Sequence, residues 1–495
     1  MENTLFEKKH IYSIHLLKYL YEKQEFVLIE DLAMNLKINR KSVTQYLNNI
    51  QAIISQSKKL NDDILKIQNR QGAYFSGTPF EYNYICKQIL KSSLTFEILE
   101  VLFFKNEPSL VSFCRNNFTT DSSVRLKIKK LNMLAEKQNI HIYISKGLIK
   151  VSGEESQIRY FAYILFWKFF KGIEWPFPQL DEVKIKESAI NILSKLNIPA
   201  TNISVRSLMY IIAINISRSR SHFPIESDFG YFLMPDLPII DSSIYNLIEH
   251  ELGLPRPLLE NELRYLTIQL LGYPQFYLYS DMFSKLQAYL KSSTSPISKM
   301  YTKAIKLFNT SIDWTLLSIE EKHISEATIM AALISSFLFP NFSFNSLGTY
   351  SGNVLRQHVP KLMDKMDTYI NQIVGDITFP FNKNYLVAHL TEAYCYVHNY
   401  IDVEKCIYFT LESDFDFITH QLLIKKIEQF LNVFFNVKYV KNSLSNPDFA
   451  IQTIELSKNR TQDIPTFVMK KPIKINEFSL LLNWVQTNFP SQIQN

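Results

Sequence analysis

The sequence predicts a mainly α-helical protein of several domains that ends in a small α/β unit. Its 495 residues exceed the length that a single hydrophobic core usually organises, about 250–300 residues. The composition is 46% hydrophobic with only 11 glycines, which favours long helices over a glycine-rich β fold. In the last hundred residues strand-like and helical stretches alternate, and this alternation predicts the α/β unit.

Residues 26–55 predict a helix-turn-helix. Apolar residues recur at helical spacing in the first helix, and Lys37-Ile38-Asn39 supplies the turn. In the second helix Val43, Tyr46, Leu47 and Ile50 are expected to face inward. The outward side chains can donate hydrogen bonds to phosphates and base edges, and they are Arg40, Lys41, Ser42, Thr44, Gln45 and Asn48. An ordinary amphipathic helix pair with a solvated polar face is the alternative.

Residues 64–75 predict a β-hairpin directly behind this motif, with Arg70 in its turn at residues 69–72. A hairpin in that place is typical of a winged helix-turn-helix, in which the second helix enters the major groove and the wing contacts the backbone or the minor groove. A supporting helix is expected over residues 1–25. The first unit is therefore assigned to residues 1–75.

Residues 76–170 predict a second unit of the same kind. Helices are expected over residues 94–104, 110–118 and 122–134, and a hairpin over residues 140–152. The third helix is expected to bury Val124, Ile128, Leu131 and Leu134. Its outward cations and the cation of the hairpin turn are candidate DNA contacts, namely Arg125, Lys127, Lys129, Lys130 and Lys146. A solvated helix face is again the alternative.

The distribution of charge favours a nucleic-acid partner for this part of the chain. Residues 1–170 contain 24 Lys and Arg against 16 Asp and Glu, a balance of +8, and residues 171–495 contain 29 against 31, a balance of −2. Neutralisation of phosphates by cations supplies most of the non-specific affinity for DNA. Chance clustering of solvated lysines would be the simpler explanation if the helix-turn-helix pattern were absent.

Two consecutive winged units, the second of which ends in GEESQIRYFAYILFWKFFKGIEWPF at residues 153–177, resemble the Mga-type virulence regulators of Gram-positive bacteria, a family that includes the anthrax toxin activator. The resemblance implies that the second winged unit is the main reader of DNA. It also implies a double-stranded promoter partner that is AT-rich or easily bent.

An internal repeat follows. Residues 262–271 align without a gap with residues 382–391, at an offset of 120 residues, and Gln269 stands where the second copy has His389. Apolar stretches upstream of each copy are spaced by the same distance. The repeat predicts two helical domains of similar size, and these are residues 171–283 and 284–395.

Both copies resemble phosphotransferase-system regulation domains, helical bundles whose histidines accept phosphate from the phosphocarrier proteins of sugar transport. The short signature Tyr-Leu-x-x-His of such domains is present at residues 385–389, so the resemblance implies His389 as a phosphate acceptor and the phosphocarrier proteins as partners. The other usual histidine lies seven residues before an arginine, yet Ile211 stands seven residues before Arg218. His222 is the nearest substitute.

The last unit, residues 396–495, is expected to contain strands over residues 405–411, 433–440 and 465–469 and helices over residues 416–431 and 477–489. It resembles the IIB component of sugar phosphotransferase permeases, whose phosphorylated cysteine lies in the loop after the first strand. Here that loop, residues 412–415, has no cysteine, and Cys406 is expected inside the strand. The unit is therefore expected to serve association or sensing, with a homodimer or a higher homo-oligomer as the result.

Catalysis is not expected. The sequence has no GxxxxGK[ST], GxGxxG, HExxH or GxSxG motif, and its histidines and four cysteines lack metal-ligand spacing, so no cofactor, metal or disulfide is expected. No signal peptide and no apolar run of about 20 residues is visible, which favours a cytoplasmic protein without a membrane partner.

These patterns together predict a DNA-binding transcriptional regulator, expected to be an activator, of virulence or carbohydrate-metabolism genes. Histidine phosphorylation by the sugar phosphotransferase system is expected to tune it. A phosphotransfer relay that keeps a helical head for protein contacts is one alternative. An RNA-binding antiterminator is the other, although such proteins carry a small β-rich RNA-binding head in place of two helix-turn-helix units.

Overall fold

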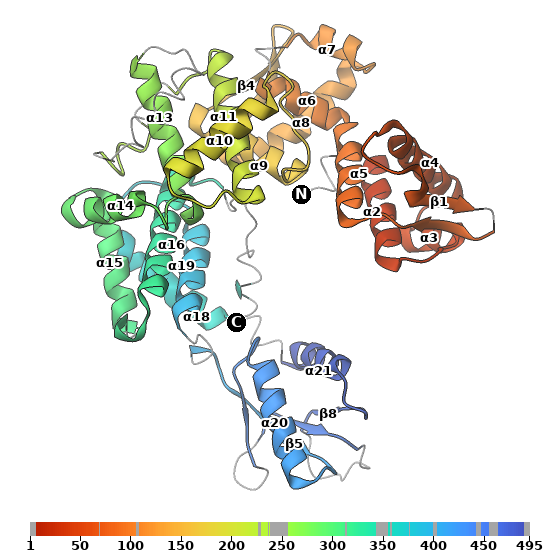
Figure 1. The fold of residues 1–495 in the computed structure, drawn as a ribbon, viewed down its shortest axis with the longest axis vertical. Coiled ribbons are helices and arrows are strands. Elements are labelled where there is room, and N and C mark those ends of the chain that lie inside the picture. Colours follow the sequence, from red (N-terminus) through yellow and green to blue (C-terminus); the bar gives the residue numbers. More distant parts are fainter. Residues whose placement is uncertain are drawn as a thin grey trace.

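The structure of the chain is a computed structural model. It describes residues 6–68, 70–104, 108–225, 229–235, 237, 256–311, 314–342, 355–356, 359–375, 377–398, 403–441, 447–454 and 464–489. Asn69 of the expected first hairpin turn, and residues 1–5 of the expected first helix, lie outside the described residues. Figure 1 shows the N-terminal elements on one side of long helices and the C-terminal α/β unit at the lower end.

The first winged unit is built from three helices and a hairpin. Its elements are α2 (Lys8–Lys23), α3 (Ile29–Leu36), α4 (Arg40–Gln56), the 3₁₀ turn η1 (Asp62–Ile64), β1 (Leu65–Gln68) and β2 (Gly72–Phe75). The next helix, α5 (Pro79–Lys91), begins beyond the expected boundary at residue 75 and packs against α2 and α4. The strands β1 and β2 pair antiparallel, as the sequence predicts for a wing. Their residues share one hydrophobic cluster with α2 to α5, which includes Leu17, Leu32, Leu47, Phe75 and Ile85.

A short backbone pairing fixes the first wing against the helix-turn-helix. Val27, just before α3, exchanges two backbone hydrogen bonds of 2.9 Å with Ala73 of β2. Gly72 starts that strand with φ +94°, and a Cβ there would lie 1.9 Å from the carbonyl oxygen of Val27. Glycine is therefore required where the wing meets the helix-turn-helix.

The second winged unit repeats this arrangement. Its elements are α6 (Leu94–Phe104), α7 (Leu110–Asn116), α8 (Asp121–Ala135), the 3₁₀ turn η2 (Glu136–Gln138), β3 (His141–Ser145) and β4 (Leu148–Ser152). The hairpin β3–β4 pairs antiparallel, and Ser109 before α7 forms a bridge with Leu148 of β4, in the same relative place as Val27 with Ala73. The predicted second wing is confirmed.

Long helices follow. They are α9 (Glu155–Phe170), α10 (Glu182–Lys195), α11 (Asn202–Arg220), α13 (Arg256–Leu271), α14 (Asp281–Ser292), α15 (Pro296–Ser311), α16 (Ile319–Leu338), α18 (Pro360–Val374) and α19 (Lys383–Val397), with short 3₁₀ turns η3 (Pro274–Phe276) and η4 (Trp314–Leu316). One continuous hydrophobic cluster runs from Phe96 of α6 to Tyr394 of α19 and includes Phe6 from the N-terminus. The second winged unit is therefore packed into the helical body, and the division of residues 76–395 into three units remains a prediction.

The repeat at an offset of 120 residues corresponds to α13 and α19. Tyr265 and Tyr385, which align in the sequence, are both buried, and so are Leu270 and Leu390. The two upstream apolar stretches lie in α11 and α16. These equivalent sequence positions therefore lie in the same kind of element, and the aligned tyrosines and leucines are buried in both copies.

The C-terminal unit has its own hydrophobic cluster around a parallel sheet. Its elements are β5 (Ile407–Glu412), α20 (Phe417–Leu431), β6 (Val437–Tyr439), β7 (Phe449–Gln452), β8 (Thr466–Val468) and α21 (Ile475–Asn488), and the strand order is β6-β5-β7-β8. The predicted α/β unit is confirmed, but three details were wrong. The strand β7 was not expected, β6 begins four residues later than expected, and Cys406 precedes the first strand.

All four cysteines are free thiols, as expected from their spacing. Burial raises the pKa of the Cys86 thiol to about 11, and burial raises the pKa of the Cys395 thiol to about 12. Both thiols are therefore protonated at neutral pH, and a protonated thiol is a poor nucleophile.

Candidate nucleic-acid interface

The first recognition helix, α4, begins after a defined cap. Lys37 adopts φ +53° in the turn, and Oδ1 of Asn39 accepts a hydrogen bond of 2.8 Å from the backbone N–H of Ser42. Because Asn39 satisfies one of the free N–H groups at the helix start, α4 begins at Arg40 and not a turn later. Val43, Leu47, Ile50 and Ile54 are buried along its inner face.

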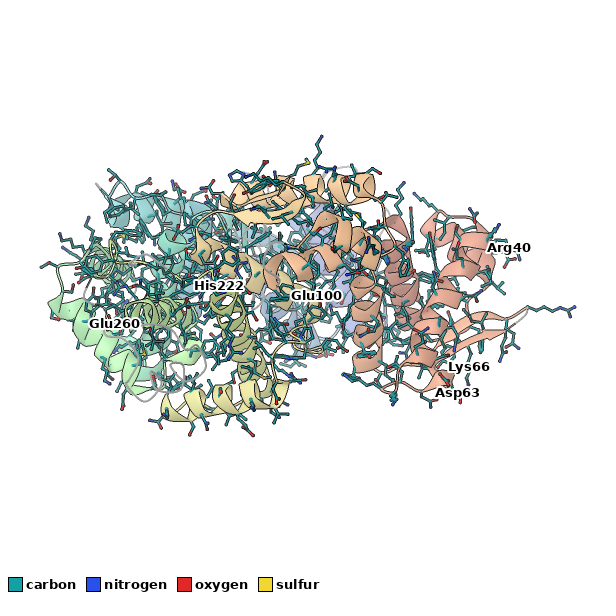
Figure 2. The ribbon with its side chains drawn as sticks, turned by 90° about the horizontal axis from the view of Figure 1, so that it is seen from above. Arg40, Asp63, Lys66, Glu100, His222 and Glu260 are labelled. Atoms are coloured by element: carbon teal, nitrogen blue, oxygen red, sulfur yellow. The ribbon has the colours of Figure 1, made fainter. Side chains whose placement is uncertain are left out.

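Five of the six predicted contacts on α4 are exposed, and they are Arg40, Lys41, Thr44, Gln45 and Asn48. Ser42 is half-buried. Figure 2 shows Arg40 at the outer surface of the first winged unit, pointing away from the rest of the chain. The guanidinium of Arg40 lies 2.7 Å from Oε1 of Glu30 on α3, and both side chains are exposed. Such a surface pair is worth at most about 1 kcal/mol, so a DNA phosphate can replace the carboxylate at little cost.

Each wing carries a cation at its tip. Arg70 has φ +72° and Lys146 has φ +50°, and both side chains are exposed. The left-handed conformation at these positions closes the two tight hairpins. The wing tips of the two units are thus alike in backbone conformation and in charge.

The second recognition helix, α8, follows the same plan. Oγ1 of Thr120 accepts a hydrogen bond of 3.3 Å from the backbone N–H of Ser123, which makes Thr120 the equivalent of Asn39. Counting from these two caps, Val124 matches Val43, and both are fully buried. Arg125, Lys129 and Lys130 are exposed as predicted. Arg125 also forms an ion pair with Asp121, one turn earlier on the same helix.

The expectation that Lys127 faces outward was wrong. Its side chain is only 12% exposed, and its Nζ lies 2.6 Å from Oε1 of Glu7, the residue before α2. Counting from the caps, Lys127 matches Tyr46, whose ring stacks on Tyr12 of α2 at a centroid distance of 6.3 Å. On both recognition helices, the side chain at this position therefore contacts α2 or the residue before it. The distance from the cap could have indicated this orientation of Lys127, because the matching Tyr46 was expected to face inward.

Glu7 is held as a carboxylate by this contact. Burial alone would raise its pKa, but hydrogen bonding with His10 and Lys127 and the positive charge of Lys127 outweigh that effect and lower the pKa to about 2. Nδ1 of His10 lies 2.8 Å from the other carboxylate oxygen of Glu7. Lys127 is therefore part of a link between the second recognition helix and the N-terminal helix.

Two exposed apolar residues of α8 were not singled out by the sequence analysis. Leu126 is 57% exposed and Met133 is 61% exposed. The buried line of α8 contains Val124, Ile128 and Leu131. Because successive residues turn by about 100°, Leu126 and Met133 lie on the side of the helix opposite this line. Their helical spacing is the signal that could have identified them.

The two phosphorylation candidates lie in separate places. His389 lies in α19 with 14% of its side chain exposed, and its Nδ1 is 2.7 Å from Oε2 of Glu392, one turn later. The ring of Tyr385 lies 4.2 Å from the imidazole, centroid to centroid. A carboxylate at Nδ1 favours the tautomer with a proton on that nitrogen, which leaves the Nε2 lone pair as the nucleophile.

Gln269, the residue that aligns with His389 in the internal repeat, has a different burial and a different hydrogen-bond partner. Gln269 is 2% exposed, and its Oε1 accepts a long hydrogen bond of 3.5 Å from Nδ2 of Asn215 on α11. In the first copy of the repeat, this helix position is therefore occupied by a buried, neutral amide. The partly open imidazole of His389 is the departure from that pattern.

His222 follows the end of α11 with φ +67°, and its side chain is exposed. Figure 2 labels it near the middle of the chain. Together with Ser152, Glu155 and Arg218 it lines a cavity of about 420 Å³ between the end of β4, the start of α9 and the end of α11. The cavity connects the base of the second wing with the helical body.

A buried network of charges lies beside this cavity. Arg159 of α9 is fully buried and contacts both oxygens of Glu262 on α13, at 2.5 and 2.8 Å. Its Nε donates to Glu155, which also binds Arg218 of α11 at 2.6 and 2.8 Å. Oε1 of Glu262 accepts a further bond of 2.6 Å from Ser219. Charges this deep are retained only when they are paired and hydrogen-bonded.

Within the part of the chain that the structure describes, no group of three or more His, Cys, Asp or Glu side chains is placed to hold a metal ion. Across those same residues, none of the helices combines the length and the apolar character that crossing a bilayer requires.

Fold and site together define a mostly helical, multidomain protein with a helix-turn-helix domain and a small C-terminal parallel sheet. Residues 79–166, from α5 through most of α9, match the Mga helix-turn-helix domain. The predicted resemblance to Mga-type regulators is therefore confirmed.

Two relatives are similar over longer stretches. The chain is 28% identical over 310 residues to the "Anthrax toxin expression trans-acting positive regulator" of Bacillus anthracis, a match of 61% of this chain and 62% of that protein. It is 22% identical over 237 residues to a "Putative trans-acting regulator" of Streptococcus pneumoniae serotype 4, a match of 48% of this chain and 45% of that protein. The matched region thus spans less than two thirds of the length of either relative.

Proposed function

We propose that the chain is a DNA-binding transcriptional regulator in which both winged units contact double-stranded DNA. The observation that carries this proposal is the repetition of one arrangement: a capped recognition helix with exposed donors, and a wing tip with an exposed cation. The relative from Bacillus anthracis is named as a trans-acting positive regulator, which supports a role in activation. Virulence or carbohydrate-metabolism genes are the proposed targets.

The proposed contacts follow the exposed faces. In the first unit they are Arg40, Lys41, Ser42, Thr44, Gln45, Asn48 and Arg70. In the second unit they are Arg125, Lys129, Lys130 and Lys146. Arg125 can leave Asp121 for a phosphate because both side chains are about half exposed and the pair is screened by water. Lys127 is left out of the interface, because Glu7 already neutralises it.

The test is a gel-shift titration on promoter DNA and on random DNA at several salt concentrations. Each cation that contacts a phosphate contributes about 0.9 to the slope of log affinity against log salt. The double variant Lys129→Ala/Lys130→Ala is expected to weaken binding and to flatten the slope by about two units. The matched control is Lys184→Ala/Lys186→Ala, which removes two exposed lysines from α10. Equal slopes for the two double variants would contradict the proposed interface.

Lys127→Ala provides a second control within α8. Because Lys127 is paired with Glu7, it holds no counterion that DNA would release, and the salt slope is expected to stay that of the wild type. A slope loss as large as that of Lys129→Ala would place Lys127 at the DNA after all.

We further propose that residues 171–283 and 284–395 are phosphotransferase-system regulation domains and that phosphocarrier proteins of sugar transport phosphorylate His389. The 2.7 Å contact with Glu392, which orients the ring, and the partial exposure of the imidazole support His389 as the acceptor. A phosphoryl group would add about −1.5 to −2 charges at a helix packed against α16 and α18. His222 is the alternative acceptor, since it is exposed beside the buried network.

The C-terminal unit is proposed to join copies of the chain into a homodimer or a higher oligomer. Large apolar side chains on both of its helices are exposed, including Phe417 and Ile418 on α20 and Ile475 and Leu480 on α21. Exposed apolar side chains on both helices support a surface that another copy of the chain covers. The loop after β5 has no cysteine, which supports association over phosphotransfer for this unit.

A further inference from the structure

The outer face of α8 carries a large apolar side chain at a position where that of α4 carries a polar one. Counting six residues from the caps Asn39 and Thr120 leads to Gln45 on α4 and to Leu126 on α8. Both side chains are exposed. A glutamine at such a position offers an amide that can pair with the edge of adenine, whereas a leucine offers only apolar surface.

Leu126 lies in the centre of the polar face. It follows Val124, which is fully buried, by two residues and therefore points to the opposite side of the helix, at about 200°. Lys129 and Lys130, one turn later, are exposed, and so is Ser122, one turn earlier. A leucine that stays 57% exposed among donors contributes only part of its hydrophobic surface to the folded chain, because water still covers most of it.

The major groove contains one apolar group that fits this side chain. Thymine carries a C5-methyl group there, and apolar side chains of recognition helices contact it. Such a contact would remove both the leucine and the methyl group from water. The neighbouring lysines would at the same time bind phosphates of the backbone and hold α8 in the groove.

We infer that Leu126 is a specificity-determining residue that recognises the 5-methyl group of thymine in the major groove. The inference rests on the proposed DNA-binding function and adds to it a preference for A·T pairs at the step that α8 reads. Because this contact carries no charge, its contribution is independent of salt, unlike that of Lys129 and Lys130.

The experiment compares two polymers that differ only in this methyl group, alternating poly(dA-dT) and alternating poly(dA-dU). The full chain is titrated with each at three salt concentrations. Wild type is expected to bind the methylated polymer about fourfold more tightly, the effect of burying one methyl-sized group. Leu126→Ala is expected to bind both polymers equally, with the wild-type salt slope. The control Ile203→Ala removes an apolar side chain that is 69% exposed on α11, and it is expected to keep the fourfold preference.

Three outcomes would contradict the inference. If wild type binds both polymers equally with a normal salt slope, Leu126 does not recognise the methyl group, while DNA binding by the chain stands. If Leu126→Ala keeps the fourfold preference, another residue reads the methyl group. If wild type binds neither polymer nor a mixed-sequence duplex, the proposed function fails and the inference fails with it. Because Leu126 is exposed, its replacement is expected to leave the fold intact, and circular dichroism of the variant checks this.

Discussion

Lys127 and Glu7, 120 residues apart in the sequence, form an ion pair with 2.6 Å between Nζ and Oε1. The pair joins the second recognition helix to the start of α2, the supporting helix of the first winged unit. Phe6, next to Glu7, packs edge-on against Phe169 of α9 at a centroid distance of 5.3 Å. The residues before α2 thus connect the first winged unit to the second recognition helix by a polar contact and to α9 by an apolar contact.

The first prediction concerns the pH dependence of this link. The folded-state pKa of Glu7, about 2, lies below the ordinary value of 4.5, so its ionised form stabilises the fold at any pH above about 4.5. That stability is lost as the pH falls from 4.5 toward 2. Glu7→Gln is expected to lower the free energy of unfolding by about 1–3 kcal/mol at pH 7 and by less at pH 3.

Urea unfolding of wild type and Glu7→Gln at both pH values measures this difference. Glu97→Gln is the comparison variant, because burial raises the pKa of Glu97 and its ionised form does not stabilise the fold. A difference between wild type and Glu7→Gln that stays constant from pH 7 to pH 3 would contradict the role given to the Glu7 carboxylate.

The second prediction concerns the buried network that joins α9, α11 and α13. Removing the charge of Arg159 leaves Glu262 buried without its partner, which costs about 3–5 kcal/mol. Arg159→Met is therefore expected to be strongly destabilised. Arg206→Met is the matched control, because Arg206 pairs with Glu182 where both side chains are about a third exposed or more. It is expected to lose about 1 kcal/mol or less.

Chemical denaturation of both variants measures the two losses. Similar losses for Arg159→Met and Arg206→Met would show that the network does not hold α9 on the helical body. The double variant Arg159→Met/Glu262→Leu should recover part of the stability of Arg159→Met, because it removes the unpaired carboxylate as well.

The third prediction concerns self-association. Deleting residues from about 400 onward removes the C-terminal sheet and the exposed apolar side chains of α20 and α21, and it is expected to reduce the dimer or the higher oligomer. Analytical ultracentrifugation compares the truncated and full-length chains at the same concentration. The double variant Phe417→Ser/Ile418→Ser tests the surface without removing the unit. If all three proteins form the same oligomer, the C-terminal unit does not mediate self-association.

The elements of the winged units could be predicted from the sequence because local signals determine them. The expected helix over residues 122–134 is α8, Asp121–Ala135, and its cap and its buried line are set by neighbours on the same helix. The strand β7 was missed because the first three residues of FAIQ are all buried, so the segment shows no alternation of apolar and polar side chains.

Long-range pairing could not be predicted in the same way. Lys127 was expected at the DNA because its neighbours on α8 are cations, and its partner Glu7 lies in another unit. Arg159 and Glu262 are 103 residues apart, and nothing in either segment alone indicates the other. Helix spacing can therefore predict which side of α8 a cation occupies, whereas the residue that neutralises it is found only in the tertiary structure.

The last prediction concerns His389. The aligned Gln269 is almost fully buried and shows that this helix position accepts a neutral hydrogen-bonding side chain, so packing alone does not require an imidazole. The imidazole of His389 is partly open, and Glu392 at 2.7 Å fixes its orientation. Addition of a phosphoryl group would place like charges beside Glu392 and would separate the helices by repulsion and desolvation. His389→Ala, His389→Asp and wild type are therefore expected to differ in promoter activity and in oligomeric state.

The measurement uses cells with and without the general phosphocarrier proteins, together with a search for acid-labile phosphate on the purified chain. Wild type is expected to respond to the phosphocarriers, and the two variants are expected not to respond. His389→Gln is the matched control, since it copies Gln269 and keeps the fold while it removes the nucleophilic nitrogen. If all four proteins behave alike and wild type carries no acid-labile phosphate, His389 has no part in regulation. The same set of substitutions at His222, which is exposed beside the network of Arg159 and Glu262, would then test the remaining candidate.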